Sequence, residues 1–249
     1  MSDMVARFAK LHQPGRPLIL YNIWDAGSAK IVAGAGARAV ATGSLSVAGA
    51  QGYEDGEALP FDVAVTNAKH ITSVVDIPVS IDLETGYGEQ SDDVEANARS
   101  MKDIGVAGLN IEDQDLNSGG LRDIDEQATR LAAAASTGIF VNARTDLFIR
   151  TPLPEHDQAL VRLALERGKA FADAGARSLF VPFVRDEQLI ATLCEKSELP
   201  VNIMMMPDSP EILRLAELGV ARISYGPGPW RAAMASFEEQ AKRIFQIEL

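Results

Sequence analysis

The sequence of 249 residues contains a single cysteine, Cys194, and no uninterrupted apolar run long enough to span a membrane. One cysteine cannot form a disulfide within the chain, which is typical of proteins in a reducing compartment. The N-terminal stretch also lacks an apolar core of signal-peptide length. These absences predict a soluble cytoplasmic protein with no membrane partner.

Positive charge is scarce as well. The chain has 23 lysines and arginines against 35 aspartates and glutamates, which gives a formal net charge of −12. Such an acidic balance argues against nucleic acid or an anionic membrane as a partner. If the substrate is itself an anion, the protein needs a local positive centre, such as a metal ion or a few arginines.

Residues for nucleophilic catalysis are sparse too. None of the three histidines, His12, His70 and His156, follows an expected strand, and Cys194 lies within an expected amphipathic helix. The sequence contains neither a serine in a nucleophile elbow nor a glycine–lysine phosphate loop. These patterns therefore do not indicate nucleophilic catalysis or P-loop nucleotide binding.

What the chain does contain is a repeated unit. A glycine that ends an expected helix, followed by a small residue and a β-favouring run, occurs at Gly36, Gly105, Gly175 and Gly219. Strands are expected near 18–22, 38–42, 78–82, 107–112, 138–143, 178–182, 200–203 and 221–224. Helices are expected near 26–34, 61–74, 91–103, 124–135, 157–173, 186–195, 209–217 and 230–246. This alternation predicts an α/β fold, a (β/α)8 TIM-type barrel that forms one domain over residues 1–249, with an open doubly wound sheet as the alternative.

The most informative stretch is Pro78–Gly88, PVSIDLETGYG. Its first four residues are typical of a buried strand, which runs into Asp82 and Glu84. Side chains two apart in an extended strand point the same way, so both carboxylates are expected on one side. Two like charges repel each other unless a cation lies between them, and oxygen ligands favour Mg2+ or Mn2+. The alternative is that these carboxylates are solvated loop residues or helix caps.

In a (β/α)8 barrel the functional groups gather at the carboxyl ends of the strands. Four carboxylates and one arginine occupy such positions: Asp55, Asp82, Glu84, Glu112 and Arg144. Together they predict a site for one divalent ion and one small anion. Because Mg2+ keeps several of its waters, most of these carboxylates would act on it through water. For individual acids the alternative is helix capping, which applies best to Asp25 and Asp113.

Four motifs resemble those of the isocitrate lyase/phosphoenolpyruvate mutase superfamily: Pro78–Gly88, Leu109–Gln114, Asn142–Asp146 and Thr42–Ser44. The similarity covers nearly the whole chain. It implies a (β/α)8 barrel in which Mg2+, or Mn2+ in its place, holds a 2-oxo acid or its enolate. It also implies a homo-oligomer, expected to be a tetramer, with the C-terminal helix packing on a neighbouring subunit.

The resemblance implies roles for individual residues. Asp82 would contact the metal, while Asp55, Glu84 and Glu112 would reach it largely through water. Thr42, Gly43 and Ser44 would hold the substrate carboxylate, and Arg144 would hold its other anionic group. Trp24 and Asp25 would line the floor of the site. Asn202, at the end of the seventh expected strand, is a further candidate for substrate binding.

The chain departs from the family pattern after the fourth expected strand. Family lyases carry a Lys-Lys/Arg-Cys-Gly-His loop whose cysteine acts as general acid or base, whereas Gln114–Arg122 is shorter and has no cysteine, lysine or histidine. Asn117 is the candidate replacement, since the mutase and phosphonopyruvate hydrolase branch uses an asparagine in a longer loop. The histidine that the mutase places after strand six is replaced by Val181-Pro182-Phe183. The catalytic candidates are therefore Arg144, Asn117 and Glu112.

The resemblance favours a Mg2+-dependent enzyme that acts on a small 2-oxo or 2-hydroxy dicarboxylic acid through a metal-stabilised enolate, as a carbon–carbon lyase or a decarboxylase. Hydrolysis or rearrangement of the P–C bond of phosphonopyruvate is the alternative reaction. A catalytically inactive 2-oxo acid binding protein is the alternative of another class. Apolar Val181, Phe183 and the methionines after Asn202 favour a substrate with a small hydrophobic substituent.

Overall fold

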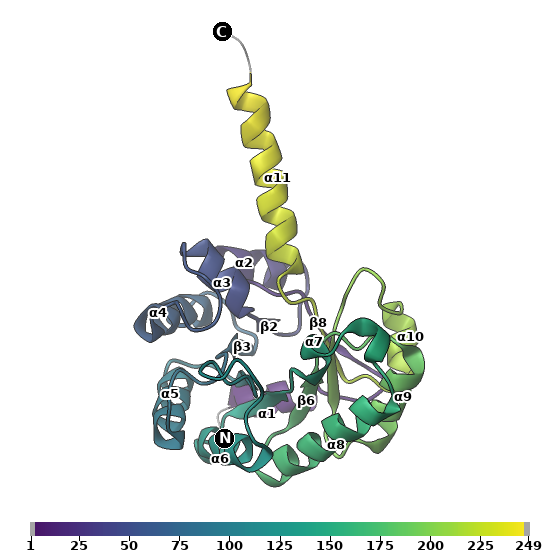
Figure 1. Ribbon diagram of the computed structural model, residues 1–249. Coiled ribbons are helices and arrows are strands. Elements are labelled where there is room, and N and C mark those ends of the chain that lie inside the picture. Colours follow the sequence, from purple (N-terminus) through teal and green to yellow (C-terminus); the bar gives the residue numbers. More distant parts are fainter. Residues whose placement is uncertain (1–2, 247–249) are drawn as a thin grey trace.

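Eight parallel strands form one sheet at the centre of the protein, in a computed structural model that describes residues 3–246 (Figure 1). The strands are β1 Leu18–Leu20, β2 Val40–Ala41, β3 Val79–Asp82, β4 Gly108–Glu112, β5 Phe140–Arg144, β6 Ser178–Val181, β7 Val201–Met204 and β8 Arg222–Ser224. Their order in the sheet is β1-β8-β7-β6-β5-β4-β3-β2. The remaining gap, between β1 and β2, is bridged in parallel by Ile23 and Thr42. The predicted (β/α)8 TIM-type barrel is confirmed.

Helices surround the barrel (Figure 1). Eight of them match the expected ranges within a few residues: α2 Ala26–Gly34, α4 Phe61–Thr72, α5 Ser91–Asp103, α6 Ile124–Ser136, α8 Gln158–Asp173, α9 Glu187–Lys196, α10 Ile212–Glu217 and α11 Gly228–Phe245. The sequence pattern did not predict α1 Asp3–Lys10, α3 Ser44–Ala50, α7 Leu147–Arg150 or the short 3₁₀ turn η1 Leu153–Glu155. Within the described residues, no helix combines the length and the apolar composition needed to cross a lipid bilayer.

The repeated glycines explain why these boundaries are readable from the sequence. Gly36, Gly105, Gly175 and Gly219 each follow a helix and have φ between 92° and 100°. This left-handed conformation is costly for a residue with a Cβ, so glycine marks the point where each helix ends. The glycines expected to end these helices are found at those positions.

Helix α1 closes the amino-terminal end of the barrel. Its residue Phe8 packs edge-on against Phe140 of β5, with ring centroids 5.0 Å apart. Gly108 of β4 leaves room for this ring, because a Cβ at that position would lie 2.6 Å from it. Buried Leu18 and Leu20 of β1 belong to the same cluster. This apolar plug seals one end of the barrel, so a site for ligands has to lie toward the other.

His12 lies beside the plug. Its ring stacks on Phe140 with centroids 4.4 Å apart, and its Nδ1 lies 2.9 Å from the carbonyl oxygen of Phe8. The residue is only 6% exposed. Burial and, to a smaller extent, the positive charge of Arg222 lower the pKa of His12 to about 3. The imidazole is therefore neutral in the folded protein at neutral pH.

Helix α11 stands away from the barrel (Figure 1). Of its 18 residues, all of which the structure describes, only Pro229 is buried. Its base is held by Trp230, which packs so closely on Gly49 of α3 that a Cβ there would lie 2.7 Å from the indole ring. Farther along, Phe237 and Phe245 are 70% and 88% exposed. Large apolar side chains are thus displayed to solvent on a helix that the other described residues do not cover.

Acid should weaken the fold through His12. The pKa of His12 is about 3 in the folded protein and 6.5, the ordinary histidine value, in the unfolded chain, so between these limits the unfolded chain binds more protons. The free energy of unfolding should therefore fall as the pH drops below 6.5, by up to ~1.4 kcal/mol per pH unit. Urea unfolding at several pH values should show this slope in the wild type and in His70→Phe, whose histidine is exposed. The slope should be smaller in His12→Phe, and an unchanged slope there would contradict the assignment.

Candidate functional site

A cavity of about 630 Å³ lies at the carboxyl ends of the strands. One side of it is polar and is formed by Thr42, Ser44, Asp55, Asp82, Asn110 and Arg144. The opposite side is apolar and includes Phe180, Pro182, Phe183, Met204, Met205 and Met206. Phe183 and the methionines thus line the cavity as expected, whereas Val181 is fully buried elsewhere in the core. The cavity combines a charged half with a hydrophobic half.

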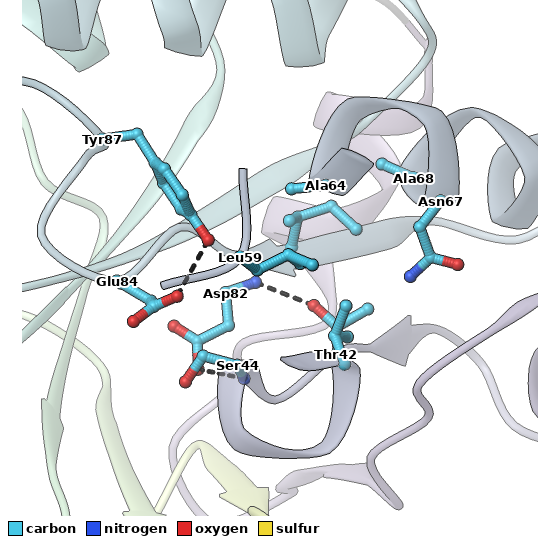
Figure 2. Close-up of a pocket in the computed structure, with 11 residues that line it drawn as sticks. Thr42, Ser44, Leu59, Ala64, Asn67, Ala68, Asp82, Glu84 and Tyr87 are labelled. Carbon is cyan, nitrogen blue, oxygen red and sulfur yellow. Dashed lines mark hydrogen bonds between the residues drawn. The ribbon is translucent and has the colours of Figure 1, made fainter. Parts of the chain in front are cut away.

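Asp82, the last residue of β3, is held by two donors. Its Oδ2 accepts a hydrogen bond from the backbone N–H of Ser44 at 3.0 Å, and its Oδ1 accepts one from Asn110 Nδ2 at 2.9 Å. Its own N–H donates to Thr42 Oγ1 at 2.9 Å, as Figure 2 shows together with the Ser44 bond. A carboxylate has about four lone-pair positions, so two remain for a further ligand.

The contact between Asp82 and Asn110 is the first of a series across the barrel. Asn142 Nδ2 donates to Asn110 Oδ1 at 2.7 Å, and Ser178 Oγ donates to Asn142 Oδ1 at 2.5 Å. These residues are partners in the register of β3, β4, β5 and β6. The side-chain orientation of Asp82 is therefore coupled to the pairing of four strands.

Glu84 reaches the site by a different route from the one expected. The strand ends at Asp82, and Glu84 lies in the following turn with φ 51°, so the alternation of an extended strand does not apply to it. Its carboxylate nevertheless lies near that of Asp82 (Figure 2), held by Tyr87 Oη at 2.9 Å and by the N–H of Glu57 at 2.6 Å. Burial and then the like charge of Asp82 raise the pKa of Glu84 to about 7.

Arg144 is already paired with two carboxylates. Its Nη1 lies 2.7 Å from Glu112 Oε2, and its Nε and Nη2 donate to the two oxygens of Asp146 at 2.6 and 3.0 Å. Burial acts to lower the pKa of Arg144, but the charges of Glu112 and Asp146 outweigh burial and raise it. Glu112 is buried behind this arginine and does not line the cavity. Arg144 faces the cavity with much of its charge compensated.

The carboxylates around Asp82 fit a divalent cation. Asp55 lies at the mouth of the cavity. Partial burial and the charge of Asp82 raise the pKa of Asp55, while a hydrogen bond from Ser44 acts in the opposite direction. Among the described residues, no three histidine, cysteine, aspartate or glutamate side chains are arranged to hold a metal ion directly. An all-oxygen set with one or two direct contacts, completed by water, is what Mg2+ or Mn2+ accepts. The donor set therefore fits such an ion.

A comparison with known protein families identifies the family of this chain. A family profile described as phosphoenolpyruvate phosphomutase matches residues 8–245. The chain belongs to the isocitrate lyase/phosphoenolpyruvate mutase superfamily. Members of this superfamily are lyases and mutases, and the chain is an enzyme of this type.

Individual relatives agree with this placement. The crystal structure of a candidate phosphonomutase from Burkholderia cenocepacia J2315 is 44% identical, with a TM-score of 0.94 over 97% of this chain and 98% of the other. The 2-methylisocitrate lyase of Escherichia coli K12 is 24% identical over 95% of this chain and 85% of its own length. A phosphonopyruvate hydrolase solved with oxalate and Mg2+ shares the fold at 21% identity, with a TM-score of 0.84 over 98% and 87% of the two chains.

Two of the expected superfamily binding residues lie outside the cavity lining. The carboxylate of Asp25 caps α2, accepting hydrogen bonds from the N–H and Oγ of Ser28 at 2.7 Å each. Trp24 packs against the small cluster formed by Val47, Ala48 and Leu59. The floor of the cavity is formed instead by Arg222 and Ser224 of β8. The capping role considered for Asp25 is thus the one that its contacts show.

Asn202 and Asn117 also lie apart from the cavity lining. Asn202 is fully buried on β7, where its Oδ1 accepts a hydrogen bond from Ser224 Oγ at 3.3 Å. Asn117 is exposed, and its N–H donates to Asp115 Oδ1 at 3.1 Å within a loop that Gln114 and Leu121 close as an antiparallel bridge. The position of this loop gives no support to Asn117 as the acid or base.

The chain's single thiol is not a substitute for the cysteine of the superfamily lyases. Cys194 lies half-buried on α9. Burial raises the pKa of its thiol to about 12, which disfavours the reactive thiolate. These surroundings agree with the sequence, which placed Cys194 within an amphipathic helix and gave no indication of a catalytic nucleophile.

Glu57 is a residue of the site that the sequence did not reveal. Its Oε1 accepts hydrogen bonds from the N–H and Oγ1 of Thr85 at 3.0 and 2.6 Å and from the N–H of Tyr87 at 2.9 Å. Glu57 has φ 62°, in the region that strains residues other than glycine. It ties the loop that carries Asp55 to the turn that carries Glu84. In the sequence it is one acid within a polar loop, with no pattern that distinguishes it.

Removing the Glu57 carboxylate should destabilise the protein measurably. Glu57→Ala removes three hydrogen bonds to a charged acceptor, and we expect it to lower the free energy of unfolding by about 2 kcal/mol. Glu57→Gln retains an acceptor oxygen and should lose less. Glu54→Ala, at an exposed position of the same loop, is the control and should change stability by less than about 0.5 kcal/mol. Equal unfolding curves for Glu57→Ala and Glu54→Ala in urea would contradict this role.

Proposed function

We propose that the protein is a Mg2+-dependent lyase or decarboxylase that breaks a carbon–carbon bond in a small 2-oxo or 2-hydroxy dicarboxylic acid. The observation that carries the proposal is the placement of Asp82. Two hydrogen bonds fix its carboxylate at the cavity wall, next to acids whose pKa values are raised by burial and, in addition, by the charge of Asp82. Such a cluster is stable as a set of anions only when a cation balances it.

In this proposal Asp82 contacts the ion, and Asp55 and Glu84 hold its water ligands. Glu112, which was also expected to do so, pairs with Arg144 away from the cavity lining and acts through that arginine. A bound Mg2+ would stabilise the negative charge that develops on the substrate oxygen. The hydrogen bonds from Tyr87 and from the N–H of Glu57 hold Glu84 toward Asp82. The Mg2+ and oxalate bound by the phosphonopyruvate hydrolase support the choice of metal and of a small dianion.

The polar side of the cavity supplies groups that suit the substrate carboxylate. Gly43 and Leu45 both line the cavity, and the N–H of Leu45 belongs to the first turn of α3, where the helix provides no acceptor of its own. Backbone donors in fixed positions stabilise an anion without any reorganisation. Arg144 adds a positive charge beside them, with Glu112 and Asp146 restricting its side chain.

The apolar side of the cavity suits the substituent of such a substrate. Phe180, Phe183 and Met204 can bury small alkyl groups, and each buried methylene contributes about 0.8 kcal/mol. This favours an alkyl-substituted dicarboxylate over a more highly charged tricarboxylate. Phosphonopyruvate remains the second candidate, because the 44% identical Burkholderia cenocepacia protein is described as a candidate phosphonomutase.

Turnover should depend on Mg2+ and on Asp82. Incubation with 2-oxo and alkyl-substituted 2-hydroxy dicarboxylates should release a 2-oxo acid product, and EDTA should abolish the release. Asp82→Asn should abolish turnover and weaken Mg2+ binding more than Glu84→Gln, for which a loss of ~10–100-fold is expected. Asp92→Asn, at an exposed position of α5, is the control and should behave as the wild type.

Three results would overturn this function. Phosphate release from phosphonopyruvate as the sole activity would establish the P–C reaction instead. Mg2+-dependent binding of oxalate without turnover of any substrate would indicate a binding protein. Full activity of Asp82→Asn in the presence of EDTA would remove the metal from the proposal.

We further propose that the protein is a homo-oligomer, with a tetramer as the expected form, in which α11 packs against another copy. The exposed apolar residues Met234, Phe237, Ile244 and Phe245 recur at helical spacing, so they lie along one stripe of α11. Covering such a stripe removes apolar surface from water, which is the main driving force of association.

Light scattering should therefore give a multiple of the chain mass of 26.7 kDa, four times that mass for the tetramer. The double variant Phe237→Asp, Ile244→Asp should dissociate because it buries two charges in the contact. The control Ala232→Asp adds a charge at an exposed position on the opposite side of α11 and should keep the oligomer. A wild-type mass of 26.7 kDa at micromolar concentration would contradict the proposal.

A further inference from the structure

Arg222 is the first residue of β8 and contributes to the floor of the cavity. The residue is only 3% exposed. Within the described residues, its guanidinium makes one hydrogen bond, from Nε to Ser224 Oγ at 3.2 Å, and no ion pair. Its Nη1 is buried and has no hydrogen-bond partner among residues 3–246. A buried arginine with so few acceptors needs a physical explanation.

Two other arginines with little exposure, Arg144 and Arg130, have more acceptors than Arg222 has. Arg144 is paired with two carboxylates, as described above. Arg130 donates to the carbonyl oxygens of Thr85, Gly88 and Glu89 at 2.7 to 2.9 Å. Both guanidinium groups are thus met by several acceptors of this chain. Arg222 is the exception among these three.

The surroundings of Arg222 offer few acceptors on the closed side of the barrel. Its Cζ lies 5.9 Å from the centroid of the Phe8 ring, in the apolar plug. His12, in the same region, is neutral, and the charge of Arg222 helps to lower the pKa of its ring. Toward β7, Ser224 Oγ accepts a hydrogen bond from Arg222 Nε and donates one to Asn202 Oδ1. These two bonds hold the Nε edge of the guanidinium in place. The cavity is the side from which a partner can approach the η nitrogens.

The free protein carries an energetic cost at this position. Burial lowers the pKa of Arg222 to about 9, and the charge of Asp82 opposes this effect only in part. A buried cation without a counterion destabilises a fold unless a ligand supplies the missing charge. Functional sites are where such uncompensated groups persist.

We propose that Arg222 binds a second carboxylate of the substrate at the floor of the cavity and so selects dicarboxylates over monocarboxylates. The guanidinium presents a planar set of donors that matches a carboxylate. This inference rests on the proposed function, in which the Asp82 side of the cavity holds the other end of the same molecule. Arg144 cannot replace Arg222 in this role without giving up the carboxylates of Glu112 and Asp146.

The test compares two ligands that differ only in the second carboxylate. Calorimetry with Mg2+ present measures the affinity of 2-methylmalate and of 2-hydroxy-2-methylbutyrate, in which the CH2–COO⁻ group is replaced by CH2–CH3. Arg222→Met should weaken binding of 2-methylmalate by about 10–100-fold and leave binding of the monocarboxylate unchanged. Arg99→Met, at an exposed position of α5, is the control and should bind both ligands as the wild type does.

A second measurement separates this role from a structural one. Because Arg222→Met removes a buried charge without a counterion, the free protein should unfold at a higher urea concentration than the wild type. A destabilised variant, or equal losses of affinity for the two ligands, would overturn the proposal. Weaker binding of phosphonopyruvate alone would overturn the assignment of a carboxylate. Binding of 2-methylmalate through Arg222 without any turnover would refute the lyase activity and leave the proposal for Arg222 intact.

Discussion

The hydrogen-bonded series from Asp82 through Asn110 and Asn142 to Ser178 connects the architecture of this barrel to the chemistry at its mouth. Barrel interiors are usually filled with branched apolar side chains, and an unpaired amide there costs free energy. Here the side-chain amides of Asn110 and Asn142 each donate to an acceptor on a neighbouring strand, because the four residues are register partners. A register slip would therefore disrupt the sheet and, at the same time, remove the hydrogen bond that orients the Asp82 carboxylate.

Much of this arrangement could be predicted from the sequence, because it depends on local rules. Left-handed glycines such as Gly105 and Gly175 end helices, and the runs after them favour strands, so the strand ends could be placed within a few residues. In a parallel barrel those ends share one side. The convergence of Asp82 and Arg144 on one cavity follows from these two facts and needs no knowledge of side-chain contacts.

What could not be predicted depends on contacts between segments far apart in the chain. Asp25 and Asp82 both follow strand-forming runs, yet one caps a helix and the other faces the cavity, and the difference is made by Ser28 and Ser44. Glu57 acts through Thr85, a residue 28 positions away. Helix α1 is short, and the fit of Phe8 against Gly108 that makes it a plug exists only in the assembled barrel.

The distribution of charge explains why two arginines in one cavity serve different purposes. Glu112 and Asp146 hold Arg144 in a fixed position, and this pairing also keeps two buried acids from repelling the carboxylates around Asp82. The remaining acids leave the mouth negative, which attracts a cation. Arg222 lies below them with its charge unpaired, so the floor attracts an anion. A ligand that chelates a cation at one end and carries a carboxylate at the other satisfies both halves at once, and the apolar wall between them accommodates its alkyl groups.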